Sequence, residues 1–432
     1  MKRADQGRLL VYVGVNIALS ILFYWKIVTE FGATAESDVF FFSMMIPNFI
    51  ISLLGGVLVN VTVPVLINEG KGVEKEVITG MLLLIGLPVA LLSILLAVTS
   101  SIWITWLGPG FSPAERDLVL SILPVQFLTG TVSVWVSIYT ALYYAQNNFI
   151  VFEKLSVFGN LVSLALIFLF AERFQVTGLA LAYCSKFLFL LVSLRILARF
   201  GVGKDVGLGV AKTVIRRLKP LVFSSLIYKT EEPIEKVLLS TAPRGELTIY
   251  HMGMQLYIIV QILYSRVIIN PLISELSASL ERRDWQSYRK SILSSLKLIL
   301  LVNIVGLGLF VLIGEPVLQV VFPYDRLTAE DVTQLWWVML YLAGYLVGGS
   351  IGQISISGFY AVGDTVTPAV IGITGFIFGI VLKFIFFMNY GVIGLALATT
   401  IYCVITSTVS FFFLAYKISK KEPGLVGEKN IR

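Results

Sequence analysis

The stretch VIGLALAT at residues 392–399 repeats the stretch VTGLALAY at residues 176–183, and this repeat decides how the chain is organised. The two stretches align without a gap at an offset of 216 residues, and the same offset aligns Tyr144 with Tyr360. Chance similarity between apolar helices rich in Gly, Leu and Ala explains a gapless match of this length less well than duplication does. The sequence therefore predicts two similar halves.

The composition places both halves in a membrane. Hydrophobic residues make up 57% of the 432 residues, charged residues only 14%, and the mean hydropathy is +0.88. A water-soluble core of this size cannot bury that much apolar side chain. The apolar residues form runs of about 20 to 30, the length of α-helical spans rather than of barrel strands. We predict an all-α protein of twelve spans, at residues 8–29, 39–66, 77–106, 117–144, 150–172, 177–200, 214–242, 248–274, 291–322, 332–361, 367–388 and 392–416.

The even number of spans in each half fixes the symmetry. Six spans return the chain to the starting side, so both halves enter the membrane in the same orientation and form parallel repeats, an architecture that favours alternating access. We predict an N-terminal six-helix lobe at 1–200, a cytoplasmic linker at 201–213, a C-terminal six-helix lobe at 214–416 and a basic cytoplasmic tail at 417–432.

The basic residues set the orientation. Most Lys and Arg outside the spans fall in segments on the same side as the N-terminus, and few fall on the other side. The positive-inside rule then predicts that both termini are cytoplasmic. Membrane orientation is a sufficient reason for the net charge of +7, so nucleic acid is not an expected partner.

Histidine and cysteine are scarce, with one His and two Cys in the chain. The single His251 has no neighbours that suggest a metal or catalytic site, and Cys184 and Cys403 fall inside predicted spans, where a small side chain packs well. We expect no metal and no cofactor. A membrane enzyme would carry a large outer loop or an intramembrane catalytic His, so we predict a transporter rather than an enzyme.

Three further stretches resemble a known family. They are FGATAESDVFFFSMMIPNFI at residues 31–50, ISELSASLERRDWQSYR at 273–289 and GFYAVGDTVTP at 358–368. Together they resemble the lipid II flippase family (MurJ/MviN) of the multidrug/oligosaccharidyl-lipid/polysaccharide exporter superfamily. The resemblance implies a flippase that moves a polyprenyl-pyrophosphate-linked saccharide across the plasma membrane by alternating access. Membrane lipids and this substrate are the expected partners, and we predict a monomer.

The resemblance also implies a cavity lined by the first, second, seventh and eighth helices, in which arginines hold the pyrophosphate. At those arginine positions this chain has Ile17, Phe23, Ile51 and Gln255. The usual phosphate clamp is therefore replaced by other residues or absent.

A charged stretch in the seventh span offers a replacement. Residues 228–239 read YKTEEPIEKVLL, and a charge near the bilayer centre costs roughly 2.5 to 3.5 kcal/mol unless it faces protein or water. On one continuous helix, Lys229, Glu232 and Lys236 share an arc, and Pro233 is expected to bend that helix. The alternative is that both lysines neutralise Glu232 in a structural ion-pair ladder.

Other polar residues complete the predicted substrate site. The eighth span places Gln255 and Arg266 nearly on one stripe, and Lys26 lies one turn beyond Phe23 in the first span. For Lys26 and Arg266 the alternative is snorkelling to an interface. Asp38 matches an acidic position of the family, although a role as N-cap of its own helix is a sufficient explanation. The predicted set is Lys26, Asp38, Lys229, Glu232, Lys236, Gln255 and Arg266.

A second set concerns ion coupling. Sodium-coupled relatives carry an acidic residue in the seventh helix and further ligands in the eleventh, which correspond here to Glu235, Gly379 and Lys383. The Lys383 ammonium lies in an apolar run and needs a carboxylate. We predict a pair with Glu235 or Glu231, with the lysine in place of sodium. A permanent structural bridge is the alternative.

One rival function remains open. A drug or cation antiporter of the same superfamily is expected to have an acidic cavity with few cations. The predicted cavity combines four cationic side chains with the carboxylate of Glu232, which argues against this function. The four are Lys26, Lys229, Lys236 and Arg266.

Overall fold

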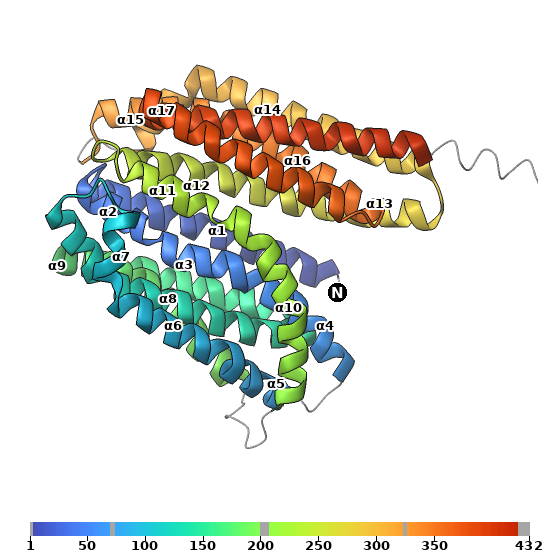
Figure 1. Cartoon of the computed structure of the whole chain (residues 1–432), viewed down its shortest axis with the longest axis horizontal. Helices are drawn as coiled ribbons and strands as arrows, with labels where there is room; N and C mark the ends of the chain where they lie inside the picture. Colours follow the sequence, from blue (N-terminus) through green and yellow to red (C-terminus); the bar gives the residue numbers. More distant parts are fainter. Residues whose placement is uncertain (1–2, 70–73, 199–206, 323–325, 422–432) are drawn as a thin grey trace, which may run out of the picture. The chain divides into compact units, whose positions relative to one another are not determined.

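The structure is a computed structural model that describes residues 3–69, 74–198, 207–322 and 326–421, and every regular element in these ranges is a helix (Figure 1). The predicted all-α fold is confirmed. The residues group into two compact units, Met1–Thr248 (unit 1) and Ile249–Arg432 (unit 2). The sequence repeat instead predicts a border at residues 201–213, part of which lies outside the described residues. The division into repeat lobes stays a prediction.

Within the described ranges, ten helical segments are long and apolar enough to cross a membrane. One of them, Val366–Lys420, covers two predicted spans, and the charged seventh span is not among the ten. The count of twelve therefore also stays a prediction.

Unit 1 begins with α1 (Arg3–Phe31). The second predicted span consists of α2 (Ala35–Ser43), α3 (Met45–Ile50), the π-helical turn η1 (Ile51–Gly55) and α4 (Gly56–Glu69). The third consists of α5 (Glu74–Met81), η2 (Leu82–Gly86), α6 (Leu87–Val98) and α7 (Ser100–Leu107), followed by α8 (Pro113–Ala145) and α9 (Phe149–Ala198). The start of α8 follows from its sequence, because Ser112 and Glu115 form a reciprocal capping box around Pro113 at the first helical position.

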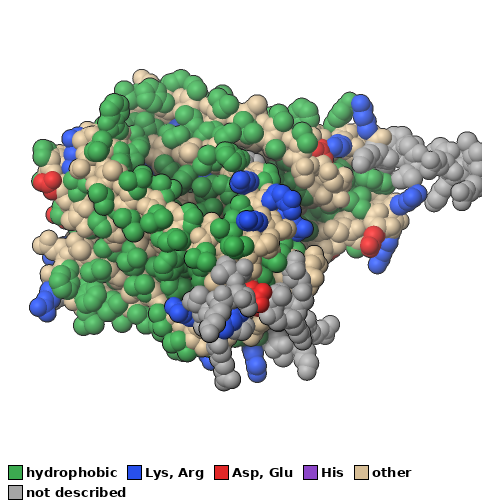
Figure 2. Space-filling model, turned by 60° about the horizontal axis from the view of Figure 1, so that its bottom comes forward, with side chains coloured by type: hydrophobic (Ala, Val, Ile, Leu, Met, Phe, Trp, Pro, Cys, Tyr) green, Lys and Arg blue, Asp and Glu red, His purple; other side chains and the backbone are tan. Residues whose placement is uncertain are grey.

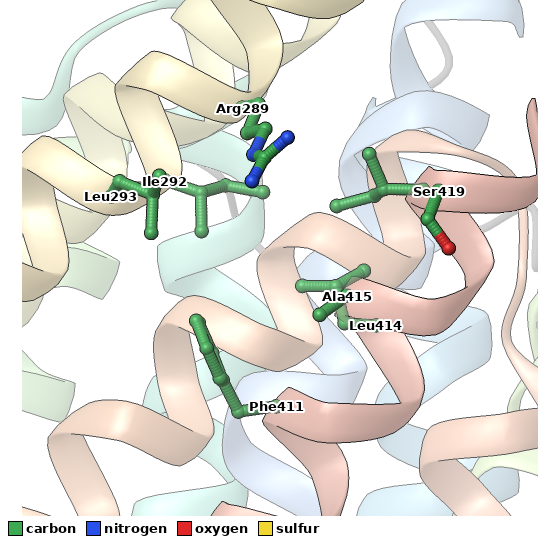
Figure 3. Close-up of a pocket in the computed structure, with 8 residues that line it drawn as sticks. Arg289, Ile292, Leu293, Phe411, Leu414, Ala415 and Ser419 are labelled. Atoms are coloured by element: carbon green, nitrogen blue, oxygen red, sulfur yellow. The ribbon is translucent and has the colours of Figure 1, made fainter. Parts of the chain in front are cut away.

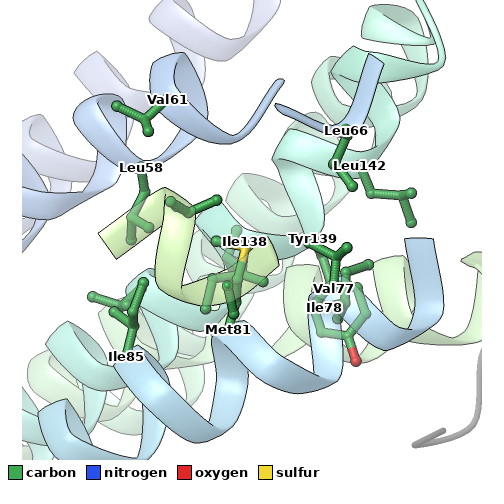
Figure 4. Close-up of a cluster of buried hydrophobic side chains, with 14 of the residues drawn as sticks. Leu58, Val61, Leu66, Val77, Ile78, Met81, Ile85, Ile138, Tyr139 and Leu142 are labelled. Carbon is green, nitrogen blue, oxygen red and sulfur yellow. The ribbon is translucent and has the colours of Figure 1, made fainter. Parts of the chain in front are cut away.

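The core of unit 1 lies where α4, α5 and α8 meet (Figure 4). Leu58, Met81 and Ile138 are fully buried there. The helix α10 (Leu208–Lys229) joins the same core through Ala211 and Val214. Contact with this core is why the start of the predicted second lobe groups with unit 1.

The predicted seventh span is not one helix. It begins at Leu208, ends at Lys229, turns at Thr230 and resumes as α11 (Glu231–Leu239). Pro233 explains the interruption, because a proline cannot donate to the carbonyl four residues earlier and its ring crowds that carbonyl. The predicted single helix is therefore wrong at Thr230, and the arc drawn through Lys229 does not continue into α11.

Unit 2 contains most of α12 (Glu246–Tyr264), η3 (Ser265–Ile269), α13 (Asn270–Glu281), α14 (Trp285–Val321), α15 (Ala329–Tyr341), α16 (Ala343–Ala361) and α17 (Val366–Lys421). Its core joins Leu276, Tyr288, Phe359 and Leu414 from four of these helices. In the turn between α16 and α17, Gly363 has φ +76°, and the Asp364 carboxylate accepts from the backbone N–H of Val366 and Thr367.

The two long helices α9 and α17 show the repeat in their backbones. Each is two helices joined at one non-helical residue, Gln175 (φ 48°, ψ −131°) and Gly391 (φ 59°, ψ −142°), which are 216 residues apart. Three residues later, a Cβ on Gly178 or Gly394 would overlap the carbonyl oxygen of Phe170 or Phe386, again 216 apart. The repeated Gly therefore allows the same tight helical hairpin in each unit.

Large apolar side chains are exposed over both units. Val320 is 83% exposed, and Trp106 and Leu312 are nearly as open. On the face shown in Figure 2, hydrophobic side chains cover most of the surface, and Lys and Arg form separate groups. Such a surface is stable against lipid rather than water.

Candidate substrate site and intramembrane charges

The centre of the site is Lys236 on α11, which is 4% exposed. Its ammonium donates to the backbone carbonyl of Phe41 and pairs with Glu232 Oε1 at 3.3 Å. Phe41 lies in the last turn of α2, which ends at Ser43. Carbonyl groups in the last turn of a helix commonly accept hydrogen bonds from outside the helix. The Lys236 side of the predicted ion-pair ladder is thus present.

Glu232 is the open end of the pair. Its side chain is 38% exposed, and it also accepts a hydrogen bond from Asn48 Nδ2 of α3 at 3.1 Å. Glu232 therefore ties α11 to α3 while keeping part of its carboxylate accessible. Sequence analysis did not include Asn48, although it is a polar residue in the middle of the second predicted span.

Lys229 lies half-buried at the end of α10, on the other side of the Thr230 turn. The structure therefore places the two lysines of this segment on different helices. Glu231 is half-buried and Glu235 is buried, both on α11.

Lys26 on α1 has local partners. Its ammonium lies 2.6 Å from Glu30 Oε2, one turn later, and 4.7 Å from the centre of the Phe168 ring. Both charged side chains are largely buried. The ion pair with Glu30 gives Lys26 a structural role that sequence analysis did not consider.

Asp38 is not the N-cap of its own helix. That position is Thr34, which forms a capping box with Ser37. The buried Asp38 carboxylate instead accepts from Gly245 N at 2.6 Å, Thr248 N at 2.8 Å and Thr248 Oγ1 at 2.6 Å. It therefore caps the first turn of α12, where free N–H groups favour a negative charge. The reading of Asp38 as the N-cap of its own helix is therefore wrong, and its place in the substrate site stays a prediction.

A second polar cluster in unit 1 was missed by sequence analysis. Asn16 Nδ2 of α1 donates to Glu153 Oε2 of α9 at 2.8 Å, and Asn160 Nδ2 donates to Asn16 Oδ1 at 3.0 Å. A cavity of about 50 Å³ beside it is lined by Asn160, Lys186 and other residues of α1 and α9. Asn16 and Asn160 are polar side chains in apolar runs of predicted spans, which is the signal that could have revealed the cluster.

In unit 2, Lys383 is completely buried. Its ammonium lies 4.9 Å from the centre of the Tyr402 ring, a cation–π contact. A Cβ at Gly379 would lie 2.8 Å from this ring, so the glycine leaves room for Tyr402. The predicted pair of Lys383 with Glu235 or Glu231 would join the two units and stays a prediction.

Gln255 is half-buried on α12, and Arg266 is exposed in η3. Cys184 and Cys403 are buried and reduced, as their positions in spans predict. Among the described residues, no three His, Cys, Asp or Glu side chains gather in a way that could hold a metal ion.

Comparison with known proteins identifies the family. The model of the lipid II flippase MurJ family matches residues 27–429. The chain belongs to this family. A probable lipid II flippase MurJ of Vibrio cholerae serotype O1 is 25% identical over 395 residues, which cover 85% of this chain and 74% of the relative.

Solved structures agree with the MurJ fold. A structure titled lipid II flippase MurJ, inward closed conformation, superposes with a TM-score of 0.82 at 17% identity, covering 94% of this chain and 87% of the other. An inward-facing multidrug resistance MATE transporter of the MOP superfamily superposes with a TM-score of 0.76 at 16% identity, covering 96% and 99%. The chain therefore has the fold of this transporter superfamily, as its sequence predicts.

Proposed function

We propose that this chain flips a polyprenyl-pyrophosphate-linked saccharide, lipid II or another cell-wall or polysaccharide precursor, across the bacterial plasma membrane by alternating access. The family membership supports this function. The observation that carries it is the enclosed Lys236 ammonium, held by Glu232 and the Phe41 carbonyl. An intramembrane charge that the fold retains indicates a substrate path.

The headgroup is recognised by exchange of partners at Lys236. Glu232 is the accessible member of the pair, so a pyrophosphate can replace its carboxylate at the ammonium. Lys229 and Lys26 supply further positive charge in unit 1. Because one anion replaces another, the buried ammonium stays paired throughout and avoids the cost of an isolated charge.

The remaining predicted residues keep separate roles. Asp38 organises the start of α12, while Gln255 and Arg266 on unit 2 stay candidates for sugar or phosphate contacts.

For coupling, we propose that Lys383, with Glu231 or Glu235, takes the place of a bound sodium ion. Transport should then continue when choline replaces sodium, and a proportional loss of rate in choline would contradict this role.

The direct test of function is complementation. A bacterial host is depleted of its own lipid II flippase and supplied with this chain, and growth and lipid II translocation are measured. Rescue identifies lipid II as a substrate. If the chain is present in the membrane at normal abundance but does not rescue growth, and deletion of its gene removes another surface glycan, the substrate is a different lipid-linked saccharide. Failure without any glycan defect contradicts the proposed function.

A drug or cation antiporter is the second candidate. The likeness to the MATE transporter supports its fold, and the Asn16–Glu153 cluster provides an acidic group inside unit 1. Efflux of a cationic dye from cells that express the chain, abolished by Glu153→Gln, would favour this candidate. Dye retention equal to that of cells without the chain would exclude that dye as a substrate.

The topology is part of the proposal. We propose that both termini are cytoplasmic, that the protein acts as a monomer and that no cofactor takes part.

A further inference from the structure

A pocket of about 260 Å³ lies between the start of α14 and the end of α17 in unit 2 (Figure 3). Its wall on α14 is formed by Arg289, Ile292 and Leu293, and its wall on α17 by five residues from Phe411 to Ser419. Its lining residues are far from α11 in sequence, and none of them belongs to either predicted site.

The lining changes from polar to apolar along the helix axes. Arg289 lies about one turn inside the start of α14, and Ser419 lies near the end of α17. One turn deeper on α14 comes Ile292, and about two turns deeper on α17 comes Phe411. A ligand that fits this gradient has a polar head at the helix ends and a hydrocarbon tail further in.

The back of the pocket is firmly packed. Leu414 and Ile418 line it and also belong to the core of unit 2. Beside them, the fully buried Tyr288 donates its hydroxyl to the Gly358 carbonyl at 2.7 Å. Leu293, in contrast, is exposed on the outer side. The wall formed by Leu414 and Ile418 is therefore fixed by the core of unit 2, and the pocket is open on the side of Leu293.

Basic residues lie near the same helix ends as Arg289. Lys290 adjoins Arg289, and Lys420 lies 4.8 Å from the Tyr416 ring near the same end of α17. Trp285, in the first turn of α14, lies at the same end, and a Trp at a helix end is typical of a membrane interface. Basic residues at an interface attract anionic lipids.

We propose that this pocket binds one anionic phospholipid of the bilayer. Its phosphate contacts the Arg289 guanidinium, and one acyl chain lies against Ile292, Leu293 and Phe411. The phosphodiester of a phospholipid carries one negative charge, which suits a pocket with one guanidinium in its lining, whereas a pyrophosphate carries more charge. This site goes beyond the proposed flippase function and does not depend on it.

The test measures lipid binding to the full-length purified chain by native mass spectrometry in detergent. The probes are phosphatidylglycerol and phosphatidylcholine with identical acyl chains. Arg289→Gln should weaken phosphatidylglycerol binding about tenfold, because it removes a charge-assisted hydrogen bond. Ala415→Phe, which keeps every charge and fills the pocket from an exposed position, should weaken it as well.

The matched control is Lys290→Gln, which removes the neighbouring positive charge from outside the lining. It should leave phosphatidylglycerol binding within about twofold of the unmodified chain. Equal losses in the Arg289 and Lys290 variants would show diffuse attraction and overturn the site, as would unchanged binding in both pocket variants. Displacement of phosphatidylglycerol by undecaprenyl pyrophosphate, lost in Arg289→Gln, would assign the pocket to the substrate class and overturn the bilayer-lipid assignment.

Discussion

At the scale of single residues, the intramembrane charges are matched rather than free wherever their contacts are described. Lys236 has Glu232 and a backbone carbonyl, Lys26 has Glu30 and a ring, and Lys383 has the face of Tyr402. A buried ion pair is weak evidence of stabilisation, since apolar residues of similar shape often stabilise as well. The choice of charged residues here is therefore better explained by transport than by folding.

Loss of one member of the central pair should destabilise the protein. Lys236→Met leaves Glu232 without its cation, and we expect a loss of about 2 kcal/mol, because Glu232 can still reach solvent. The thermal midpoint of the purified chain and its membrane abundance measure this loss.

The double variant Lys236→Met/Glu232→Gln separates folding from function. It removes both charges, so abundance should recover while translocation of the lipid-linked substrate stays low. Normal translocation by the double variant would show that the pair is only structural.

Asp364 should stabilise unit 2 in a pH-dependent way. The hydrogen bond from the Lys417 ammonium, together with that from Thr367, holds the pKa of the Asp364 carboxyl well below its usual range. The pKa of Asp364 is lower in the folded state than in the unfolded state. Its carboxylate therefore adds to the free energy of unfolding at pH values above the usual carboxyl pKa, and this stabilisation is lost as the pH falls through the folded pKa.

Asp364→Asn keeps the helix cap but removes this charge. It should lower the thermal midpoint at pH 7 and approach the unmodified chain in acid. A constant difference between the two from pH 7 down to strongly acidic pH would mean that the charge does not contribute.

At the scale of elements, the helical hairpins α9 and α17 carry the repeat. Both use a residue with positive φ immediately before the repeated Gly segment, but the residue types differ, Gln175 in one and Gly391 in the other. A side chain at positive φ is strained, and glycine is not. The second hairpin therefore has the residue that suits the backbone, and the first does not.

Exchange of these residues should shift stability in opposite directions. Gln175→Gly should raise the free energy of unfolding by about 1 kcal/mol, and Gly391→Ala should lower it by about 1–2 kcal/mol. Thermal unfolding of the purified variants measures both changes.

Gly372→Ala is the matched control on α17. Gly372 has open space around it and ordinary helical φ, so alanine there should be neutral or slightly stabilising. A loss as large as that of Gly391→Ala would contradict the role of positive φ.

At the scale of the whole molecule, the distribution of basic residues predicts which ends of the helices are cytoplasmic. The turn between α13 and α14 carries Arg282 and Arg283, whereas Glu330 lies at the start of α15, at the opposite end of α14. The two turns should face opposite sides of the membrane.

Cysteine labelling tests this topology in intact cells. After replacement of the two buried native cysteines by alanine, a membrane-impermeant thiol reagent should label Glu330→Cys and leave Arg283→Cys unlabelled until the membrane is opened. The reverse pattern would invert the proposed topology and the direction of the flippase.

The sequence by itself determined the helical membrane fold, the twofold repeat and the presence of charges in the seventh span. These follow from composition, hydrophobic run length and local spacing, which act within one helix or one repeat. The tight hairpins at Gly178 and Gly394 belong here too, since the repeated segment specifies them.

Only the tertiary structure decided which groups those charges meet. Asp38 caps α12 rather than its own helix, Phe41 and Asn48 complete the surroundings of α11, and Asn16 joins Glu153. Each of these contacts joins helices distant in sequence, and periodicity along one helix gives the direction of a side chain without the identity of the group it reaches. The break at Thr230, in contrast, has a local cause in Pro233, because a proline three residues later removes a helical hydrogen bond.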